Sequence, residues 1–119
     1  MVQPMRWLVL LTLLASPATA DPAKVIAVKA TPSGGAWRFE VTLSHGDTGW
    51  DDYANGWRVT NETGTVLGTR VLAHPHVDEQ PFTRSLSGVR IAHGVKRVWI
   101  ETSTLPEGWG DARFEVDLR

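Results

Sequence analysis

The chain has 119 residues, of which 42% are hydrophobic and 21% charged, a size that allows one ordinary domain. Its 12 basic and 13 acidic residues give a formal net charge of −1, so we expect no nucleic acid partner, which would need a basic surface. The absence of cysteine excludes disulfides, thiolate metal sites, thiol nucleophiles and lipid-modified cysteine anchors.

Residues 1–20 have the pattern of a secretory signal peptide. One basic residue, Arg6, precedes the apolar run Trp7–Leu14, and the segment closes on small residues before Asp21. The apolar run is shorter than the ~20 residues that cross a bilayer, so we expect cleavage and no membrane anchor afterwards. The mature domain, residues 21–119, would carry a formal net charge of −2 because Arg6 is removed. We expect a periplasmic or secreted protein, and the missing cysteines favour a bacterial one.

The mature chain alternates between apolar and polar residues with a period of two, and no stretch has the spacing of an amphipathic helix. The alternation predicts an all-β fold whose strands each have one buried and one wet face. The expected strands are, in chain order, Val25–Ala30, Trp37–Leu43, Trp57–Val59, Thr65–Leu72, Pro81–Ser87 with Val89–Ile91, Lys96–Thr102 and Arg113–Leu118. About seven short strands predict an antiparallel two-sheet sandwich.

Local signals refine this pattern. Gly64 closes a predicted hairpin turn that begins at Asn61, and Gly88 marks a predicted bulge. Trp37 and Trp57 occupy alternating positions typical of core residues, whereas the alternation turns Trp99 outward.

The order of strand, Gly64 hairpin, strand and final alternating strand over residues 36–118 resembles an immunoglobulin-like or fibronectin-III-like sandwich. The Cys…Trp…Cys core of antibody domains is absent, so the resemblance implies a fold and no function. The segments 66–72, 74–86 and 108–110 also resemble small exported bacterial proteins of no assigned function. That resemblance implies export.

Strand parity predicts which loops meet. In an antiparallel chain that reverses at each connection, alternate connections lie at the same end of the sandwich. The second, fourth and sixth connections, over residues 45–55, 73–80 and 104–111, should therefore share one end, with His93 at the other. Loops gathered at the tip of a rigid sandwich are a common place for binding.

The first functional hypothesis is a divalent metal site at this end. His45, His74 and His76 would supply imidazole ligands and Asp47 a carboxylate, with Asp51 or Asp78 as alternative carboxylates, a donor set that suits Zn or Cu(II). His-x-His places two imidazoles on the same side of an extended segment. A variant uses Asp47, Asp51 and Asp52 as oxygen ligands for Ca²⁺, although their spacing does not match an EF-hand.

The second hypothesis is a metal-free module that binds a protein or a saccharide. Its contacts would come from Trp50 and Trp109, with Tyr53, Trp99, Asp51 and Asp78 nearby, because exposed tryptophan dominates many ligand and protein contacts. The alternative role of Trp50 and Trp109 is to cap the core. No Gly-x-Ser-x-Gly elbow or other base and nucleophile pattern is present, so we expect binding and no enzymatic activity.

Overall fold

A computed structural model describes residues 21–118 of the chain. The predicted signal peptide, residues 1–20, and Arg119 lie outside the described residues. The described part forms eight strands: β1 (Lys24–Ser33), β2 (Ala36–Ser44), β3 (Tyr53–Thr60), β4 (Val66–Val71), β5 (Phe82–Val89), β6 (Arg97–Leu105), β7 (Gly108–Trp109) and β8 (Phe114–Asp117). Within residues 21–118 no helix is long and apolar enough to cross a membrane.

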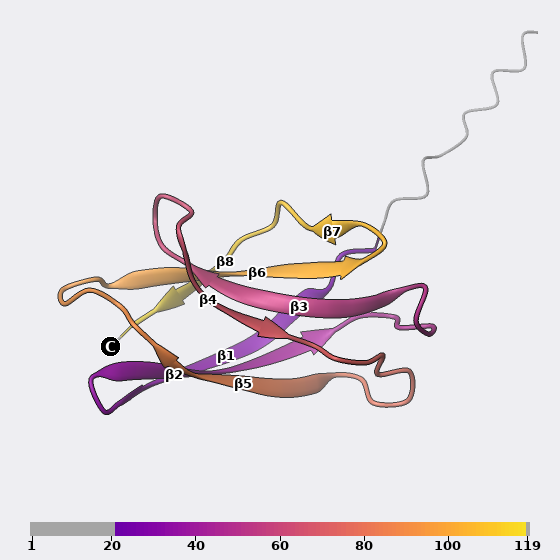
Figure 1. Ribbon diagram of the computed structural model, residues 1–119, viewed down its shortest axis with the longest axis horizontal. Coiled ribbons are helices and arrows are strands. Elements are labelled where there is room, and N and C mark those ends of the chain that lie inside the picture. The colour runs from indigo at the N-terminus through magenta and orange to yellow at the C-terminus, as the bar shows by residue number, and fades with distance from the viewer. Residues whose placement is uncertain (1–20, 119) are drawn as a thin grey trace, which may run out of the picture.

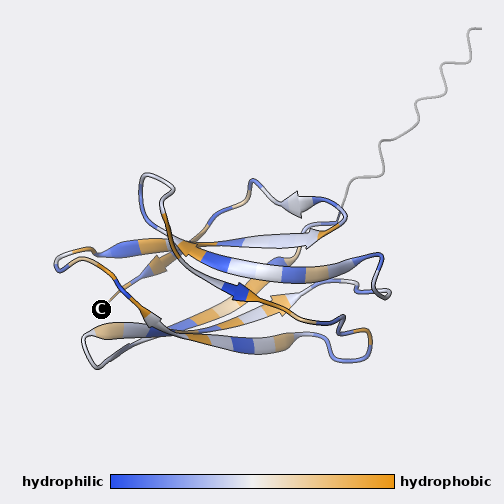
Figure 2. Ribbon diagram, in the orientation of Figure 1, coloured by the Kyte–Doolittle hydropathy of each residue, from blue (hydrophilic) through white to orange (hydrophobic). Residues whose placement is uncertain are grey.

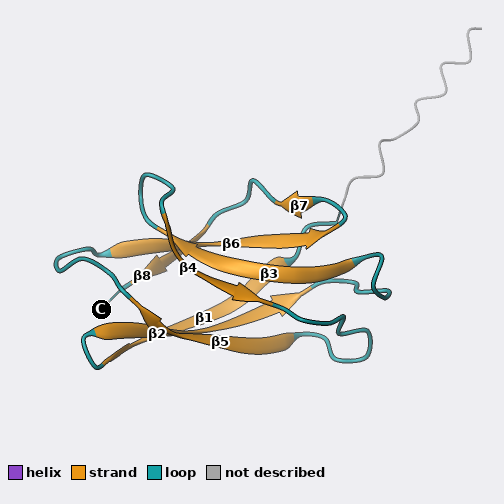
Figure 3. Ribbon diagram, viewed as in Figure 1, coloured by secondary structure: helices purple, strands orange, loops and turns teal. Residues whose placement is uncertain are grey.

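The strands form two antiparallel sheets, which agrees with the predicted β-sandwich. One sheet has the order β1-β2-β5, and the other has the order β4-β3-β6-β7, with β8 also paired to β6. The strands run lengthwise and their connections collect at the two ends (Figures 1 and 3). This arrangement brings loops that are far apart in sequence to one end of the molecule.

Alternation along each strand builds the core between the sheets, and polar and apolar segments alternate visibly along the ribbon (Figure 2). On β2 the side chains of Phe39, Val41 and Leu43 are fully buried, while Glu40 and Thr42 between them are partly exposed. Trp57 on β3 is the largest fully buried side chain among the described residues, and Trp37 packs against the core from a half-buried position. Both tryptophans therefore belong to the core, as their spacing predicts.

The two glycine signals are confirmed. The amide of Gly64 donates to the carbonyl oxygen of Asn61 at 3.0 Å, and its φ of 84° is the left-handed conformation that closes the hairpin. Gly88 has a φ of 72° and lies where the pairing of β2 with β5 shifts register, which is the predicted bulge.

Some predicted boundaries and faces were wrong. β3 begins at Tyr53, before the expected start at Trp57, because residues 53–56 pair with the end of β6. β7, only two residues long, was not predicted. Phe114 was expected on the buried face of the last strand but is 39% exposed, because β8 is an edge strand whose burial begins at Val116.

Candidate functional site: the loop end

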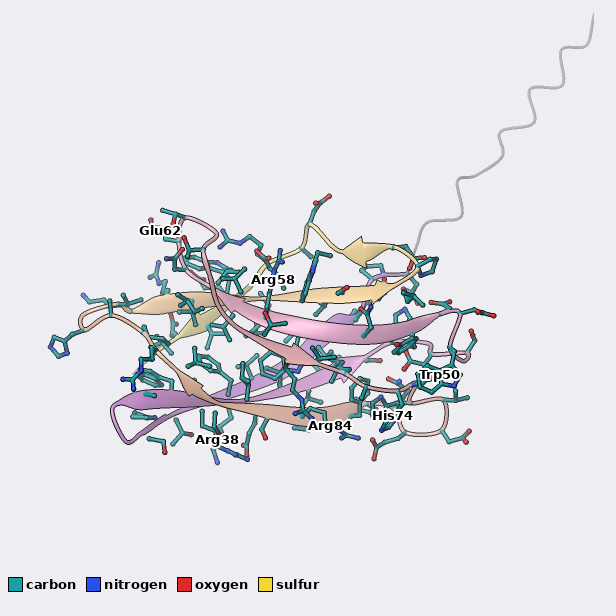
Figure 4. The ribbon with its side chains drawn as sticks, in the orientation of Figure 1. Arg38, Trp50, Arg58, Glu62, His74 and Arg84 are labelled. Atoms are coloured by element: carbon teal, nitrogen blue, oxygen red, sulfur yellow. The ribbon has the colours of Figure 1, made fainter. Side chains whose placement is uncertain are left out.

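Three connections meet at one end of the sandwich, which we call the loop end. They are residues 45–52 between β2 and β3, residues 72–81 between β4 and β5, and residues 106–107 between β6 and β7. Trp50 and His74 lie at this end, whereas Glu62 lies at the opposite end with the β3–β4 hairpin (Figure 4). His93 belongs to the β5–β6 connection, at the end opposite Trp50, so the parity argument places the histidines as expected.

Asp47 is the centre of the loop end. Its side chain is fully buried. One carboxylate oxygen, Oδ1, lies 2.6 Å from Nδ1 of His45 and accepts the amide of Ala54 at 2.9 Å, while Oδ2 accepts the amide of His76 at 2.8 Å. One carboxylate thus joins the β2–β3 loop, the start of β3 and the β4–β5 loop.

The His45 ring is buried with both nitrogens engaged. Nε2 lies 2.9 Å from the carbonyl oxygen of Asp21 and 3.8 Å from a carboxylate oxygen of Asp52. Carboxylate and carbonyl oxygens accept hydrogen bonds and do not donate them, so both ring contacts are satisfied when both nitrogens carry hydrogen. A ring in that state has no lone pair for a metal ion. The geometry instead commits both ring nitrogens of His45 to oxygen atoms of Asp47 and Asp21, so the ring ties the β2–β3 loop to the start of the described chain.

His76 is held from the other side. Its ring stacks on Phe82, with ring centroids 4.0 Å apart, and Nε2 lies 2.9 Å from a guanidinium nitrogen of Arg84. Burial, with the nearby charges of Arg84 and His74 acting in the same direction, lowers the pKa of His76 below its ordinary value of 6.5. His76 therefore accepts from Arg84 as a neutral ring. Its Nδ1 is buried and has no hydrogen-bond partner in the described structure.

Gln80 also connects the two loops, and no sequence pattern predicted its role. Its side-chain oxygen accepts the amide of His45 at 2.9 Å, and its side-chain nitrogen donates to the carbonyl oxygen of His76 at 2.9 Å. We call Asp47, His45, His76 and Gln80 the loop lock. The loop lock satisfies buried backbone groups that loops would otherwise leave unpaired.

Apolar side chains at the loop end are exposed to solvent. Trp50 lies at the tip of a tight turn closed by hydrogen bonds from Thr48 to Asp52 and from Asp52 to Gly49, and its ring meets the edge of Tyr53 at 5.7 Å. Trp50 is 63% exposed, so it does not cap the core. Val71 at the end of β4 and Val77 in the β4–β5 loop are 69% and 52% exposed. Asp51 and Asp78 are exposed beside them.

Trp109, which the parity argument also assigned to this end, is 40% exposed and packs along the sheet. It lies on β7 and its ring covers the outer face of the five-stranded sheet, where the Arg58 guanidinium stacks 4.0 Å from the ring centroid. The ring lies over Gly56, where a Cβ would be 3.6 Å from it, an ordinary van der Waals distance. The β6–β7 turn is so short that pairing with β6 draws Trp109 back along the sheet.

The same outer face carries a charged cluster that the sequence did not reveal. Glu101 on β6 is almost buried and binds Arg58 at 2.8 Å through one oxygen and Arg113 at 3.2 Å through the other. Arg113 in turn lies over the ring of Trp99, 4.6 Å from its centroid. Outward-facing Trp99, which alternation predicted, is therefore stacked against a cation.

The structure brings together only some of the residues in each of the two predicted sets of metal ligands, the set for Zn²⁺ or Cu²⁺ and the set for Ca²⁺. Within residues 21–118 no group of three or more histidine, aspartate or glutamate side chains is arranged to hold a metal ion. For Ca²⁺, both oxygens of Asp47 are engaged by the loop lock and Asp51 is exposed. His74 and His76 do adjoin each other, with ring centroids 4.6 Å apart.

The fold and the loop end define a small two-sheet β-sandwich with fixed loops at one end. The chain is 38% identical, over 96 residues, to a protein of Halomicrobium mukohataei named "Putative lipoprotein". The aligned segment is 80% of this chain but 47% of that relative, so the chain spans about half the length of the relative it matches. No family model matches the chain, and no solved structure matches it.

Proposed function

We propose that the protein is an exported, cell-envelope module that binds a partner protein through its loop end. Export is supported by the signal-peptide pattern of residues 1–20 and by the name of the relative from Halomicrobium mukohataei. Only the cell-envelope location is taken from that name. A lipid-modified cysteine is not, because this chain contains no cysteine. The observation that carries the binding role is the exposed Trp50 on a loop whose base is fixed to buried Asp47.

The loop lock supports binding by reducing the entropy lost on association. A loop that is already fixed loses little freedom when a partner docks on it. Trp50, Val71 and Val77 supply the exposed aromatic and aliphatic groups that dominate protein interfaces, and Asp51 and Asp78 supply a polar rim.

The chemistry of the loop end favours binding over catalysis. Asp47 and His45, its buried ionisable pair, are fully engaged in hydrogen bonds that hold the loops. A general base or nucleophile needs a free lone pair within reach of a substrate. The exposed groups around Trp50 offer contact area instead.

We also infer that the sandwich is immunoglobulin-like. The inference is supported by the order β1-β2-β5 in one sheet and β4-β3-β6-β8 in the other, the arrangement in which the first, second and fifth strands face the third, fourth, sixth and last. Immunoglobulin-like domains commonly bind with loops gathered at one end, which agrees with the proposed use of the loop end.

The binding role is tested by capture from the cell envelope. The protein is immobilised through its C-terminal side, because β8 ends away from the loop end and immobilisation there leaves Trp50 free (Figure 1). We expect the wild type to retain one discrete protein from solubilised envelope, and we expect Trp50→Ala and Val71→Asp to reduce its retention about tenfold or more. Quantitative mass spectrometry of the eluates measures the effect.

Val66→Asp is the matched control. Val66 and Val71 are the first and last residues of β4, and Val66 is 45% exposed at the opposite end of the molecule. Retention by Val66→Asp should equal that of the wild type. If Trp50→Ala retained the partner as well as the wild type does, the proposed binding role of the loop end would be wrong.

A divalent metal bound by His74 and His76 is the second candidate. It is supported by the adjacency of the two rings and by the buried, unpartnered Nδ1 of His76. Metal binding there requires Arg84 to release Nε2, because a ring that accepts from Arg84 keeps its proton on Nδ1. On this hypothesis, calorimetric titration shows binding of Zn²⁺ or Cu²⁺ that His74→Ala abolishes and that His93→Ala, a change in an exposed histidine at the other end, leaves intact. Absence of heat with either ion, or binding unchanged in His74→Ala, would exclude it.

A further inference from the structure

A groove opens at the end of the molecule opposite the loop end. One wall is the β3–β4 turn, with Asn61, Glu62 and Thr63, and the other is the β5–β6 connection around Lys96. Trp99 of β6 also lines it. Its volume of about 650 Å³ lies within the range of small-molecule sites.

Trp99 is held in position before any ligand arrives. The Arg113 guanidinium lies over the ring at 4.6 Å and is fixed by Glu101 at 3.2 Å and by the carbonyl oxygen of Asn61 at 2.7 Å. Cation–π stacking and these charge-assisted hydrogen bonds restrict the ring. The groove thus has a rigid aromatic surface, which binds at little entropic cost.

The walls of the groove offer both hydrogen-bond donors and acceptors. Glu62 and Lys96 are exposed, and neither takes part in an ion pair among residues 21–118. Asn61 uses its side-chain oxygen to accept from Thr63 and Thr65, which shapes the turn and leaves its amide NH₂ as a donor. The charges of Glu62 and Lys96 offset each other, and Arg97, which also lines the groove, pairs with Glu115 at 3.5 Å and Asp117 at 3.3 Å, so the groove presents no unpaired excess of positive charge to an anion.

We propose that this groove is a saccharide-binding site. A saccharide presents apolar C–H faces that pack on an aromatic ring and hydroxyls that both donate and accept hydrogen bonds. The groove combines Trp99 for the first with Glu62, Lys96 and the Asn61 amide for the second. Because the groove and Trp50 lie at opposite ends, this site is independent of the proposed protein partner.

The experiment titrates the mature protein with three soluble probes, the hexasaccharides of β-1,4-linked glucose, β-1,4-linked N-acetylglucosamine and α-1,4-linked glucose. Tryptophan fluorescence and isothermal calorimetry report binding. We expect at least one hexasaccharide to bind and Trp99→Ala to weaken that binding about tenfold or more, the effect of removing a central aromatic contact. Trp50→Ala, which removes an exposed tryptophan at the other end, should bind as the wild type does.

Glu62→Ala and Lys96→Ala keep the proposal testable if Trp99→Ala does not fold, because both side chains are exposed and their truncation leaves the core intact. Each should weaken binding about threefold or more, by loss of a charge-assisted hydrogen bond. The proposal is overturned if none of the three probes binds at about 10 mM. It is also overturned if Trp99→Ala, or both wall variants, bind with the affinity of the wild type.

Discussion

Replacement of Asp47 by alanine is expected to lower the free energy of unfolding by about 3–5 kcal/mol, the cost of removing a buried carboxylate on which three hydrogen-bond contacts converge. The substitution leaves the His45 ring and the amides of Ala54 and His76 without their acceptor in a site closed to water. Urea denaturation followed by circular dichroism measures the change. Hydrogen exchange at the two amides should show faster local opening.

Two variants sharpen the Asp47 test. Asp51→Ala, four residues along the same loop, removes an exposed carboxylate and should change stability by less than about 0.5 kcal/mol. Asp47→Asn preserves side-chain volume but points an NH₂ group at a hydrogen-bond donor. Its loss of unfolding free energy should therefore fall between the losses of Asp51→Ala and Asp47→Ala. A change below about 1 kcal/mol in Asp47→Ala would show that the loops do not depend on this carboxylate.

For Asp47, the sequence predicts the location of the residue but not its bonding partners. Parity predicted that His45, Asp47, His74 and His76 would share one end, because that depends only on chain reversal. Whether Asp47 would bind a cation or backbone amides depends on where residues 54 and 76 place their N–H groups, which no pattern in the sequence encodes. The role of these residues as metal ligands stays a prediction.

The fold was predictable where one face of a strand is buried along its length. β2 alternates strictly and was predicted almost to its bounds. β7 was not, because two residues carry no periodicity and pair only through the turn before them. The same pairing of β7 with β6 decides where the Trp109 ring lies, and no pattern in the sequence indicates it.

Part of the groove could have been predicted from the sequence. The parity argument that gathers three connections at the loop end gathers the others, including the β3–β4 turn and the β5–β6 connection, at the opposite end. Alternation had already turned Trp99 outward. Combining the two would have placed a tryptophan beside Glu62 and Lys96. The contact between Arg113 and Trp99 was not predictable, because it depends on the path of the irregular segment that connects β7 to β8.

The second large effect is expected at Glu101. Its replacement by alanine should lower the free energy of unfolding by about 2–4 kcal/mol, because two guanidinium groups then face each other across a nearly buried site with no carboxylate between them. The effect is smaller than at Asp47 because the Arg58 and Arg113 side chains are 25% and 34% exposed and water can partly solvate them. Thermal unfolding compared with the wild type measures the loss.

Glu40→Ala is the matched control for Glu101→Ala, since Glu40 also pairs with an arginine, Arg38, at 3.4 Å, but on the open surface of the other sheet, where such a pair contributes at most about 1 kcal/mol. Release of Arg113 in Glu101→Ala should also free the Trp99 ring and reduce the near-ultraviolet circular dichroism of the tryptophans, while Glu40→Ala, on the other sheet, leaves that spectrum unchanged. Equal stability losses in the two variants would mean that Glu101 acts as an ordinary surface carboxylate. An unchanged spectrum in Glu101→Ala would mean that Arg113 does not depend on Glu101 to hold Trp99 in the groove.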